Sequence, residues 1–266
     1  MSLITNRVGT LEYLTAANIR VPHCFTTRLG GVSKGFLHSL NIGMHRGDDP
    51  ENVRQNYAIL GQALGFAPEQ LVLARQTHSD IVRAVSPDDA QGLDHHRYPE
   101  CDALITNTPG TGLVVFTADC TPILLHDPVT GAVGAVHAGW RGTAAQIGAK
   151  TVRAMERCYS CKPENIRAAI GPNIAQCCFQ TDADVPEAMR ASLGEDALDC
   201  IQTRGEKFYV NLKEINARIL YRAGVTQVEI SQECTACEPE RFWSHRVTGG
   251  VRGSQGAIIL CREGRQ

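Results

Sequence analysis

Two apolar runs separated by a short turn sequence, within residues 117–142, constrain the fold more than any other feature of the chain. Pro128 and Gly131 occupy the turn, where proline presets one backbone angle and glycine tolerates a left-handed conformation. The flanking runs, 123–127 and 132–137, are therefore expected to pair as the two strands of an antiparallel hairpin.

The register of this hairpin brings Cys120 close to His137. Pairing across the turn sets Asp127 opposite Ala132. The residue opposite His137 is then Pro122, which has no N–H to donate, so regular pairing should weaken or end there. The same register, continued, leaves Cys120 and His137 as diagonal neighbours with backbones roughly 7–8 Å apart. A thiolate and an imidazole at this separation can share one metal ion.

Cysteine and histidine together select zinc or another borderline-soft metal, and a catalytic zinc site keeps one position open beside three protein ligands. His78 is the best third ligand by context, because it lies between two strand-like segments, 71–74 and 81–85, where a side chain is exposed at a sheet edge. His78, Cys120 and His137 are therefore candidate metal ligands and candidate catalytic residues, which spacing alone does not single out.

Other interpretations of these residues remain open. Cys120 can be a buried thiol beside two structural histidines. It can be a nucleophile with His137 as its base, as in thiol hydrolases. A non-enzymatic alternative makes the zinc structural, with its fourth position closed by His126 or Asp119.

Two loops have the composition of anion or substrate sites. Residues 139–143 run from a strand into a helix, so free backbone N–H groups and Arg141 would face an anion such as phosphate. A glycine turn that serves only close packing is the alternative there. Residues 26–33 combine glycine flexibility with Arg28 and hydroxyl groups, which is typical of a substrate loop.

Short apolar runs alternate with Gly/Pro turns and a few helical stretches, which indicates a mixed layering of helices and strands without the regular alternation of a doubly wound fold. The expected strands are 71–74, 81–85, 113–117, 123–126, 132–137, 167–170, 225–230 and 257–261. The expected helices are 50–64, 144–157, 184–192 and 212–223, with Asp49 and Thr143 as N-terminal caps or first-turn residues. No repeat or linker divides residues 1–266, so we expect a single domain.

Composition excludes several classes of protein. A net charge of −2 without a dense Lys/Arg stripe argues against a nucleic-acid partner. Residues 1–7 lack the features of a signal peptide, and no apolar run approaches the roughly 20 residues that span a bilayer. We expect a monomeric, cytoplasmic protein that does not associate with membranes, and 266 residues suffice for a core that forms without metal.

Eleven cysteines, an odd number, in a chain of this length favour reduced thiols over disulfides. Cys158 with Cys161 and Cys234 with Cys237 both have the spacing of a zinc half-site, but the pairs lie far apart in the chain, so separate local roles are expected. His95 and His96 are expected in a solvated loop, and the same interpretation applies to His23, His38 and His45.

The chain resembles the laccase-domain family, named for polyphenol oxidase activity, later associated with purine nucleoside phosphorylase activity, and in some members labelled peptidoglycan editing factor. Seven ordered blocks carry the resemblance, which runs nearly end to end: 27–33, 39–43, 49–56, 76–79, 118–122, 137–142 and 170–172. The family has a Ser-Tyr-Arg-Arg segment near its C-terminus, whereas this chain has Ser244, His245, Arg246 and Val247, which puts substrate contacts there in doubt.

The resemblance implies an α+β fold of layered mixed β-sheets flanked by helices, and one zinc ion bound by His78, Cys120 and His137. It implies phosphorolysis of adenosine, inosine, guanosine and methylthioadenosine, and deamination of adenosine. The substrate-binding residues are then expected to be Arg28, Asn41, Gln76 and Arg141. Of these, Arg28, Asn41 and Arg141 are the expected phosphate contacts.

Two rival functions follow from the same site. Copper is less expected than zinc, because multicopper oxidases use His-x-His pairs and none of the nine histidines is so placed. A polyphenol oxidase is therefore the weaker rival. The other is a cysteine-dependent hydrolase of peptidoglycan precursors, with Cys120 as its nucleophile.

Overall fold

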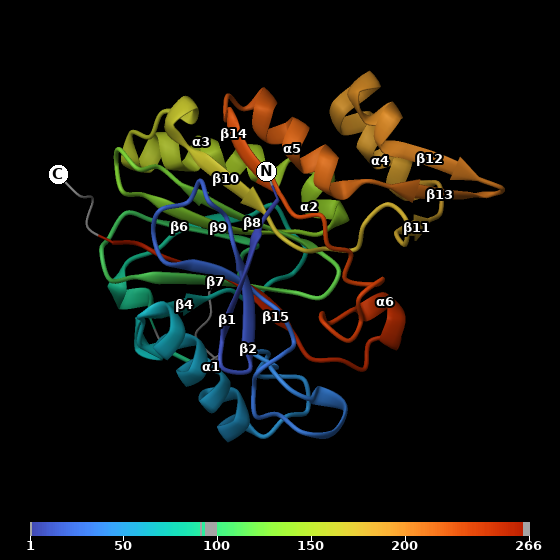
Figure 1. The fold of residues 1–266 in the computed structure, drawn as a ribbon. Helices are drawn as coiled ribbons and strands as arrows, with labels where there is room; N and C mark the ends of the chain where they lie inside the picture. The colour runs from blue at the N-terminus through green and yellow to red at the C-terminus, as the bar shows by residue number, and fades with distance from the viewer. Residues whose placement is uncertain (1, 91, 94–99, 263–266) are drawn as a thin grey trace.

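The structure of the protein is a computed structural model that describes residues 2–90, 92–93 and 100–262. Two six-stranded mixed β-sheets pack face to face, and a third sheet of three strands lies to one side (Figure 1). The first sheet has the order β1 (Ile4–Val8), β2 (Leu11–Thr15), β3 (His23–Thr26), β15 (Gln255–Leu260), β7 (Gly112–Thr117), β4 (Leu71–Leu73).

The second sheet contains the predicted hairpin at its centre. Its order is β14 (Gln227–Ile230), β10 (Arg167–Ile170), β8 (Thr121–His126), β9 (Val133–Ala138), β6 (Ala103–Thr106), β5 (Val82–Ala84). The third sheet has the order β11 (Gln180–Thr181), β13 (Lys207–Val210), β12 (Ile201–Arg204). The α-helices are α1 (Pro50–Leu64), α2 (Trp140–Ala144), α3 (Ile147–Tyr159), α4 (Asp184–Leu193), α5 (Leu212–Arg222) and α6 (His245–Thr248).

Side chains that alternate along the central strands produce four layers. Leu124 of β8 packs in the core between the two large sheets, whereas its neighbours Ile123 and Leu125 pack on the opposite face. Helices α3 and α5 cover that opposite face, and α1 covers the outer face of the first sheet (Figure 1). The fold is therefore α+β, with layered mixed sheets flanked by helices in a single domain, as predicted. That this domain extends over all of residues 1–266 stays a prediction.

The register of the β8–β9 hairpin is confirmed. Pro122 pairs with His137, and the Asp127 N–H donates to the Ala132 carbonyl at 2.9 Å. Pairing does not stop at Pro122 but continues for one more pair, because the His137 N–H points to the other neighbouring strand and needs no partner in β8. All eight predicted strands are present, with small shifts at their ends.

The helix predicted over 144–157 is two helices. Helix α2 begins earlier, at Trp140, with Gly139 as its N-cap, so that Thr143 lies inside the helix rather than at its start. The chain then breaks at Gln146, whose φ of 59° is left-handed, before α3 begins at Ile147. The other three helices form as predicted, and the Asp49 carboxylate caps α1 by accepting from the Glu51 N–H.

The sequence analysis did not find seven strands: β1, β2, β3, β6, β11, β12 and β13. Strand β1 is almost wholly exposed, so it has no apolar alternation to detect. Strands β3 and β6 have four residues each, all buried, and runs this short show no period. Among the described residues, no helix combines the length and the apolar character that crossing a membrane requires.

We expect Leu124→Ala to lower the free energy of unfolding by about 2–5 kcal/mol, because it opens a cavity in the core that both large sheets share. Val129→Ala is the control, since Val129 is 72% exposed in the hairpin turn. Chemical denaturation of both variants measures the difference. Equal losses would contradict the assignment of Leu124 to the shared core.

Candidate metal centre and pocket

Two of the three candidate metal ligands lie where the chain crosses from the first large sheet to the second, and the third lies in a strand of the second sheet. His78 lies in the connection from β4 to β5, and Cys120 in the connection from β7 to β8. His137 is in β9, where alternation places it on the same face as Ala135, toward the first sheet. The packing of the two sheets therefore brings together three residues that span 59 positions of the chain, from His78 to His137.

The donor atoms of His78, Cys120 and His137 all lie within 4.8 Å of one another. His78 Nε2 is 3.7 Å from Cys120 Sγ, and the two imidazole rings have centroids 4.9 Å apart in an edge-to-face arrangement. Gly139 permits this approach, because a Cβ there would lie 2.8 Å from His78 Cδ2. Two imidazole nitrogens and one thiolate form a donor set that suits a borderline-soft metal ion.

Asp102, just before β6, positions two of the three ligands. Its carboxylate is fully buried and accepts from His137 Nδ1 at 2.7 Å. It also accepts from the backbone N–H groups of Thr77, His78 and Ser79 and from the Ser79 hydroxyl, at 2.6–3.2 Å. Burial raises the pKa of Asp102, but the hydrogen bonds from His137 and Ser79 outweigh it and lower the pKa to about 2. A carboxylate behind a ligating imidazole fixes the ring and leaves Nε2 free for a metal.

Asp119 holds the segment that carries Cys120. Its φ of 84° is left-handed, and its carboxylate accepts from the hydroxyls of Thr235 (2.6 Å) and Ser244 (3.1 Å) and from the Arg246 N–H (2.7 Å). The carboxylate is therefore engaged away from the ligand cluster. Neither Asp119 nor His126, the two candidates for a fourth ligand, belongs to the His78 group in the described part of the chain.

Cys120 and His137 shift each other's protonation. Burial raises the pKa of the Cys120 thiol, but the positive charge of His137 and hydrogen bonds from both histidines lower it to about 6. Burial lowers the pKa of His137, but the Cys120 thiolate and Asp102 raise it to about 9. A thiolate is thus present near neutral pH, which both a metal ligand and a nucleophile require.

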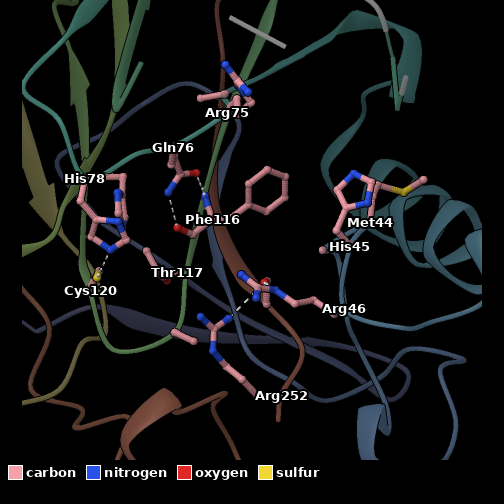
Figure 2. Close-up of a pocket in the computed structure, with 15 residues that line it drawn as sticks. Met44, His45, Arg46, Arg75, Gln76, His78, Phe116, Thr117, Cys120 and Arg252 are labelled. Atoms are coloured by element: carbon pink, nitrogen blue, oxygen red, sulfur yellow. Dashed lines mark hydrogen bonds between the residues drawn. The ribbon is translucent and has the colours of Figure 1, made fainter. Parts of the chain in front are cut away.

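The three residues line a pocket of about 320 Å³, and Figure 2 shows His78 and Cys120 together on one wall of it. The other lining residues are Gly43, Met44, His45, Arg46, Ala74, Arg75, Gln76, Phe116, Thr117, Ala118, Arg252 and Ser254. This volume falls within the range of small-molecule sites, roughly 300–1,000 Å³. His45 is exposed in a turn, as the sequence analysis expected, and it also lines the pocket.

Arg46 and Arg252 are a pair of arginines that the sequence analysis missed. Both guanidinium groups hydrogen-bond to Ser254, and within the described ranges neither forms an ion pair with a carboxylate. Burial lowers the pKa of both, and the charge of Arg46 further lowers that of Arg252, to about 10. Arg252 Nε is buried without a hydrogen-bond partner in the structure. Two adjacent cations with unused donors are suited to an anion.

Of the four predicted substrate-binding residues, only Gln76 lines this pocket. Its amide is engaged with both the N–H and the carbonyl of Phe116, which ties the His78 loop to β7. Arg28 donates to the carbonyls of His38 and Pro239 and lies 3.9 Å over the Trp243 ring. These contacts show that Arg28 has a structural role in linking neighbouring segments. Its role in substrate binding stays a prediction.

Asn41 and Arg141 also lie outside the pocket lining. Asn41 is fully buried and uses its amide on Gly43, Asp48 and Ser254. Arg141 is exposed and packs on the Trp140 ring at 4.2 Å. Substrate binding by either residue stays a prediction.

Other predicted positions can also be placed. His23 is buried in β3, where Nε2 accepts from the Ala16 N–H at 2.8 Å, so its assignment to a solvated loop is wrong. His38 is exposed as expected, and His95 and His96 lie outside the described residues. The divergent segment from Ser244 to Val247 is not part of the pocket lining and contacts the site through Asp119.

The fold and the site together define an α+β protein of two packed mixed sheets, with a His–Cys–His group of metal-binding type in a pocket at their ends. The chain belongs to the family described as multi-copper polyphenol oxidoreductase laccase, which matches residues 22–262. The resemblance inferred from the sequence blocks is thereby confirmed.

Relatives within this family match along most of their length. A protein of Deinococcus radiodurans named purine nucleoside phosphorylase is 40% identical over 94% of this chain and 92% of its own. Purine nucleoside phosphorylase YfiH of Escherichia coli is 36% identical over 85% of this chain and 88% of its own. The crystal structure of YlmD from Geobacillus stearothermophilus superposes with a TM-score of 0.92 at 34% identity, covering 98% of this chain and 100% of that one.

We expect Asp102→Asn to weaken the binding of Zn²⁺ by about 10- to 100-fold, because the amide can no longer accept from both His137 and the 77–79 loop. Competition with a chromogenic chelator measures the affinity. Asp80→Asn is the control, since Asp80 lies in the same loop but pairs with Lys150 at the surface. An unchanged affinity in Asp102→Asn would remove Asp102 from the metal centre.

Proposed function

We propose that this chain is a zinc-dependent purine nucleoside phosphorylase that acts on adenosine, inosine, guanosine and methylthioadenosine and also deaminates adenosine. The observation that carries the proposal is a single pocket with the His78–Cys120–His137 group on one wall and the Arg46–Arg252 pair on another (Figure 2). Relatives named purine nucleoside phosphorylase support the same class of reaction. A monomer in the cytoplasm, without nucleic-acid or membrane partners, belongs to this proposal.

Zinc is the proposed ion at His78, Cys120 and His137, because one thiolate and two imidazoles match the ligands of catalytic zinc sites. When bound there, it would supply a Lewis acid facing the pocket. Asp102 holds the proton on His137 Nδ1, so that the proton a metal ion would displace is the one on Nε2. Cys120 is largely ionised at neutral pH even before a metal is added, since its pKa is about 6.

Phosphorolysis forms a bond between a phosphate oxygen and C1′ of the ribose while the bond from C1′ to the purine nitrogen breaks, and the departing base takes up a proton. The protein must orient the phosphate and compensate its charge. Arg46 and Arg252 are the proposed phosphate ligands, because an anion between them would relieve their mutual repulsion and use the free Arg252 Nε–H. The Phe116 ring, which projects into the pocket in Figure 2, offers an apolar face to the purine.

Deamination would replace the amino group at C6 of adenine with an oxygen from water, and ammonia would leave. This reaction needs an activated water but no phosphate. The dependence of each product on phosphate therefore separates the two proposed activities.

A second candidate, a cysteine-dependent hydrolase of peptidoglycan precursors, is favoured by one observation: Cys120, His137 and Asp102 form a thiol–imidazole–carboxylate series. It requires Cys120 as a covalent nucleophile and activity without metal. A polyphenol oxidase, the third candidate, requires bound copper.

Product analysis of the purified protein, with its zinc and copper contents measured, tests these candidates. We expect free base and ribose 1-phosphate from inosine and methylthioadenosine only when phosphate is present, and inosine from adenosine without phosphate. No turnover of any nucleoside by zinc-loaded protein would refute the proposal.

Cys120→Ala should lose this zinc and every purine activity together while circular dichroism stays unchanged, because the core folds without metal. Purine turnover by the zinc-free variant would contradict a role for the metal. Hydrolysis of peptidoglycan precursors by wild-type protein stripped of metal would favour the thiol mechanism.

We expect Arg252→Met to raise the KM for phosphate by about 10- to 100-fold, the loss expected for one charge-assisted hydrogen bond, and to leave deamination nearly unchanged. Arg75→Met is the matched control, because Arg75 lines the same pocket but pairs with Glu100 at 2.7 Å. Equal effects of the two substitutions on the KM for phosphate would count against the Arg46–Arg252 site.

A further inference from the structure

Four cysteines outside the pocket gather at the ends of two neighbouring strands. Strands β10 and β14 pair in parallel, so the segments that leave their carboxyl ends run side by side. Cys177 and Cys178 follow β10, and Cys234 and Cys237 follow β14. A bridge between Asn173 and Cys234 continues the pairing beyond the strands. The Cys158–Cys161 pair is not part of this group, in agreement with the sequence analysis. Cys234 and Cys237 instead lie beside Cys177 and Cys178, a pair that the sequence analysis did not consider.

The sulfur atoms have the spacing of a tetrahedral site. All four Sγ atoms lie within 4.8 Å of one another. Cys177 Sγ is 3.7 Å from Cys178, 3.8 Å from Cys234 and 3.6 Å from Cys237 Sγ, and Cys178 Sγ is 3.3 Å from Cys237 Sγ. Zn–S bonds of about 2.3 Å place the sulfur atoms of a tetrahedral site about 3.8 Å apart. A disulfide would require about 2.05 Å instead.

The surroundings suit a thiolate cluster. The Ala175 N–H donates to Cys234 Sγ at 3.3 Å. The Cys237 N–H donates to the Cys234 carbonyl, which closes the turn between these two cysteines. Arg246 donates to the Cys178 carbonyl at 3.0 Å, and the buried Lys213 ammonium donates to the Glu233 carbonyl beside Cys234. Zn²⁺ with four thiolates carries a net charge of −2, which these two cations offset in part.

Access and spacing point to the same chemistry. Cys177 and Cys237 are exposed and Cys178 is half-buried, so an ion can enter from solvent, while Cys234 is buried and anchors the group. We propose that Cys177, Cys178, Cys234 and Cys237 bind a second Zn²⁺ ion in a closed four-thiolate site that cross-links the segments following β10 and β14. Each thiol gives up its proton on binding, and no change of oxidation state is involved.

The cross-link has a consequence for the segment that carries Cys120. Thr235, inside the turn from Cys234 to Cys237, donates to the Asp119 carboxylate, and the Ile174 N–H donates to the Asp119 carbonyl at 3.0 Å. Both segments that the second zinc would join therefore hold Asp119, the residue before Cys120. The second zinc is structural, and its presence does not depend on the reaction in the pocket.

Zinc stoichiometry tests the proposal. We expect two Zn²⁺ per chain by mass spectrometry of the elements, in wild-type protein purified with zinc and a thiol reductant. The double variant Cys234→Ser/Cys237→Ser should hold one, the separate variant Cys120→Ala should hold one, and the combination should hold none. Cys158→Ser is the control, because Cys158 is exposed in the other pair of this spacing, and it should hold two. The same zinc content in wild type and in Cys234→Ser/Cys237→Ser would overturn the proposal, whatever the pocket site holds.

Cobalt substitution provides a second measurement that does not depend on whether the variants fold. Co²⁺ in a four-thiolate site gives intense sulfur-to-metal charge transfer and tetrahedral d–d bands, and a site with one thiolate gives far weaker charge transfer. We expect the intense bands in wild-type and Cys120→Ala proteins. The absence of these bands from reduced wild-type protein loaded with Co²⁺ would show that the cluster does not bind metal.

Discussion

The buried carboxylate of Asp102 is the constraint on which the candidate metal centre depends. Burying an isolated charge costs several kcal/mol, and five donors from His137 and the 77–79 loop offset that cost. The same hydrogen bonds hold the 77–79 loop, which carries His78, at a fixed separation from strand β9, which carries His137. The His78 loop has little regular structure of its own, so its geometry depends on this carboxylate together with the Gln76 amide that ties the loop to β7.

What the sequence predicted well depends on local chemistry. The β8–β9 register followed from one turn and one proline, and helix α1 from its cap at Asp49, because in both cases the deciding contacts lie a few residues apart. Arg46 and Arg252 meet only because the strand after Arg252, β15, lies at the centre of the first sheet. Cys177 meets Cys234 only because β10 pairs with β14. Neither pairing leaves a periodic signal in the chain, so no spacing rule could reveal these neighbours.

Charge is distributed unevenly around the pocket. The thiolate of Cys120 lies at the wall that would hold a cation, while Arg46 and Arg252 form a wall that attracts anions. Burial and repulsion from Arg46 lower the pKa of Arg252 to about 10, so its charged form is destabilised. The guanidinium nevertheless stays protonated at neutral pH. An anion bound there gains from both guanidinium groups without first breaking an ion pair, and both residues line the pocket whereas Arg141 does not, which is why this wall is the stronger candidate for phosphate.

Backbone strain is concentrated beside the ligands. Among the described residues, four that are not glycine have positive φ, and two of these four are His78 and Asp119. Each such conformation costs on the order of 1–2 kcal/mol and persists only where the surroundings enforce it. Asp102 enforces it at His78, through the N–H groups of the loop. At Asp119 the enforcing contacts come from Thr235, Ser244 and Arg246, all in the C-terminal part of the chain. The segment after β14 is thus tied to the geometry of Cys120 from outside the pocket, and a metal ion that fixes this segment would stabilise the strained conformation on which the thiolate's position depends.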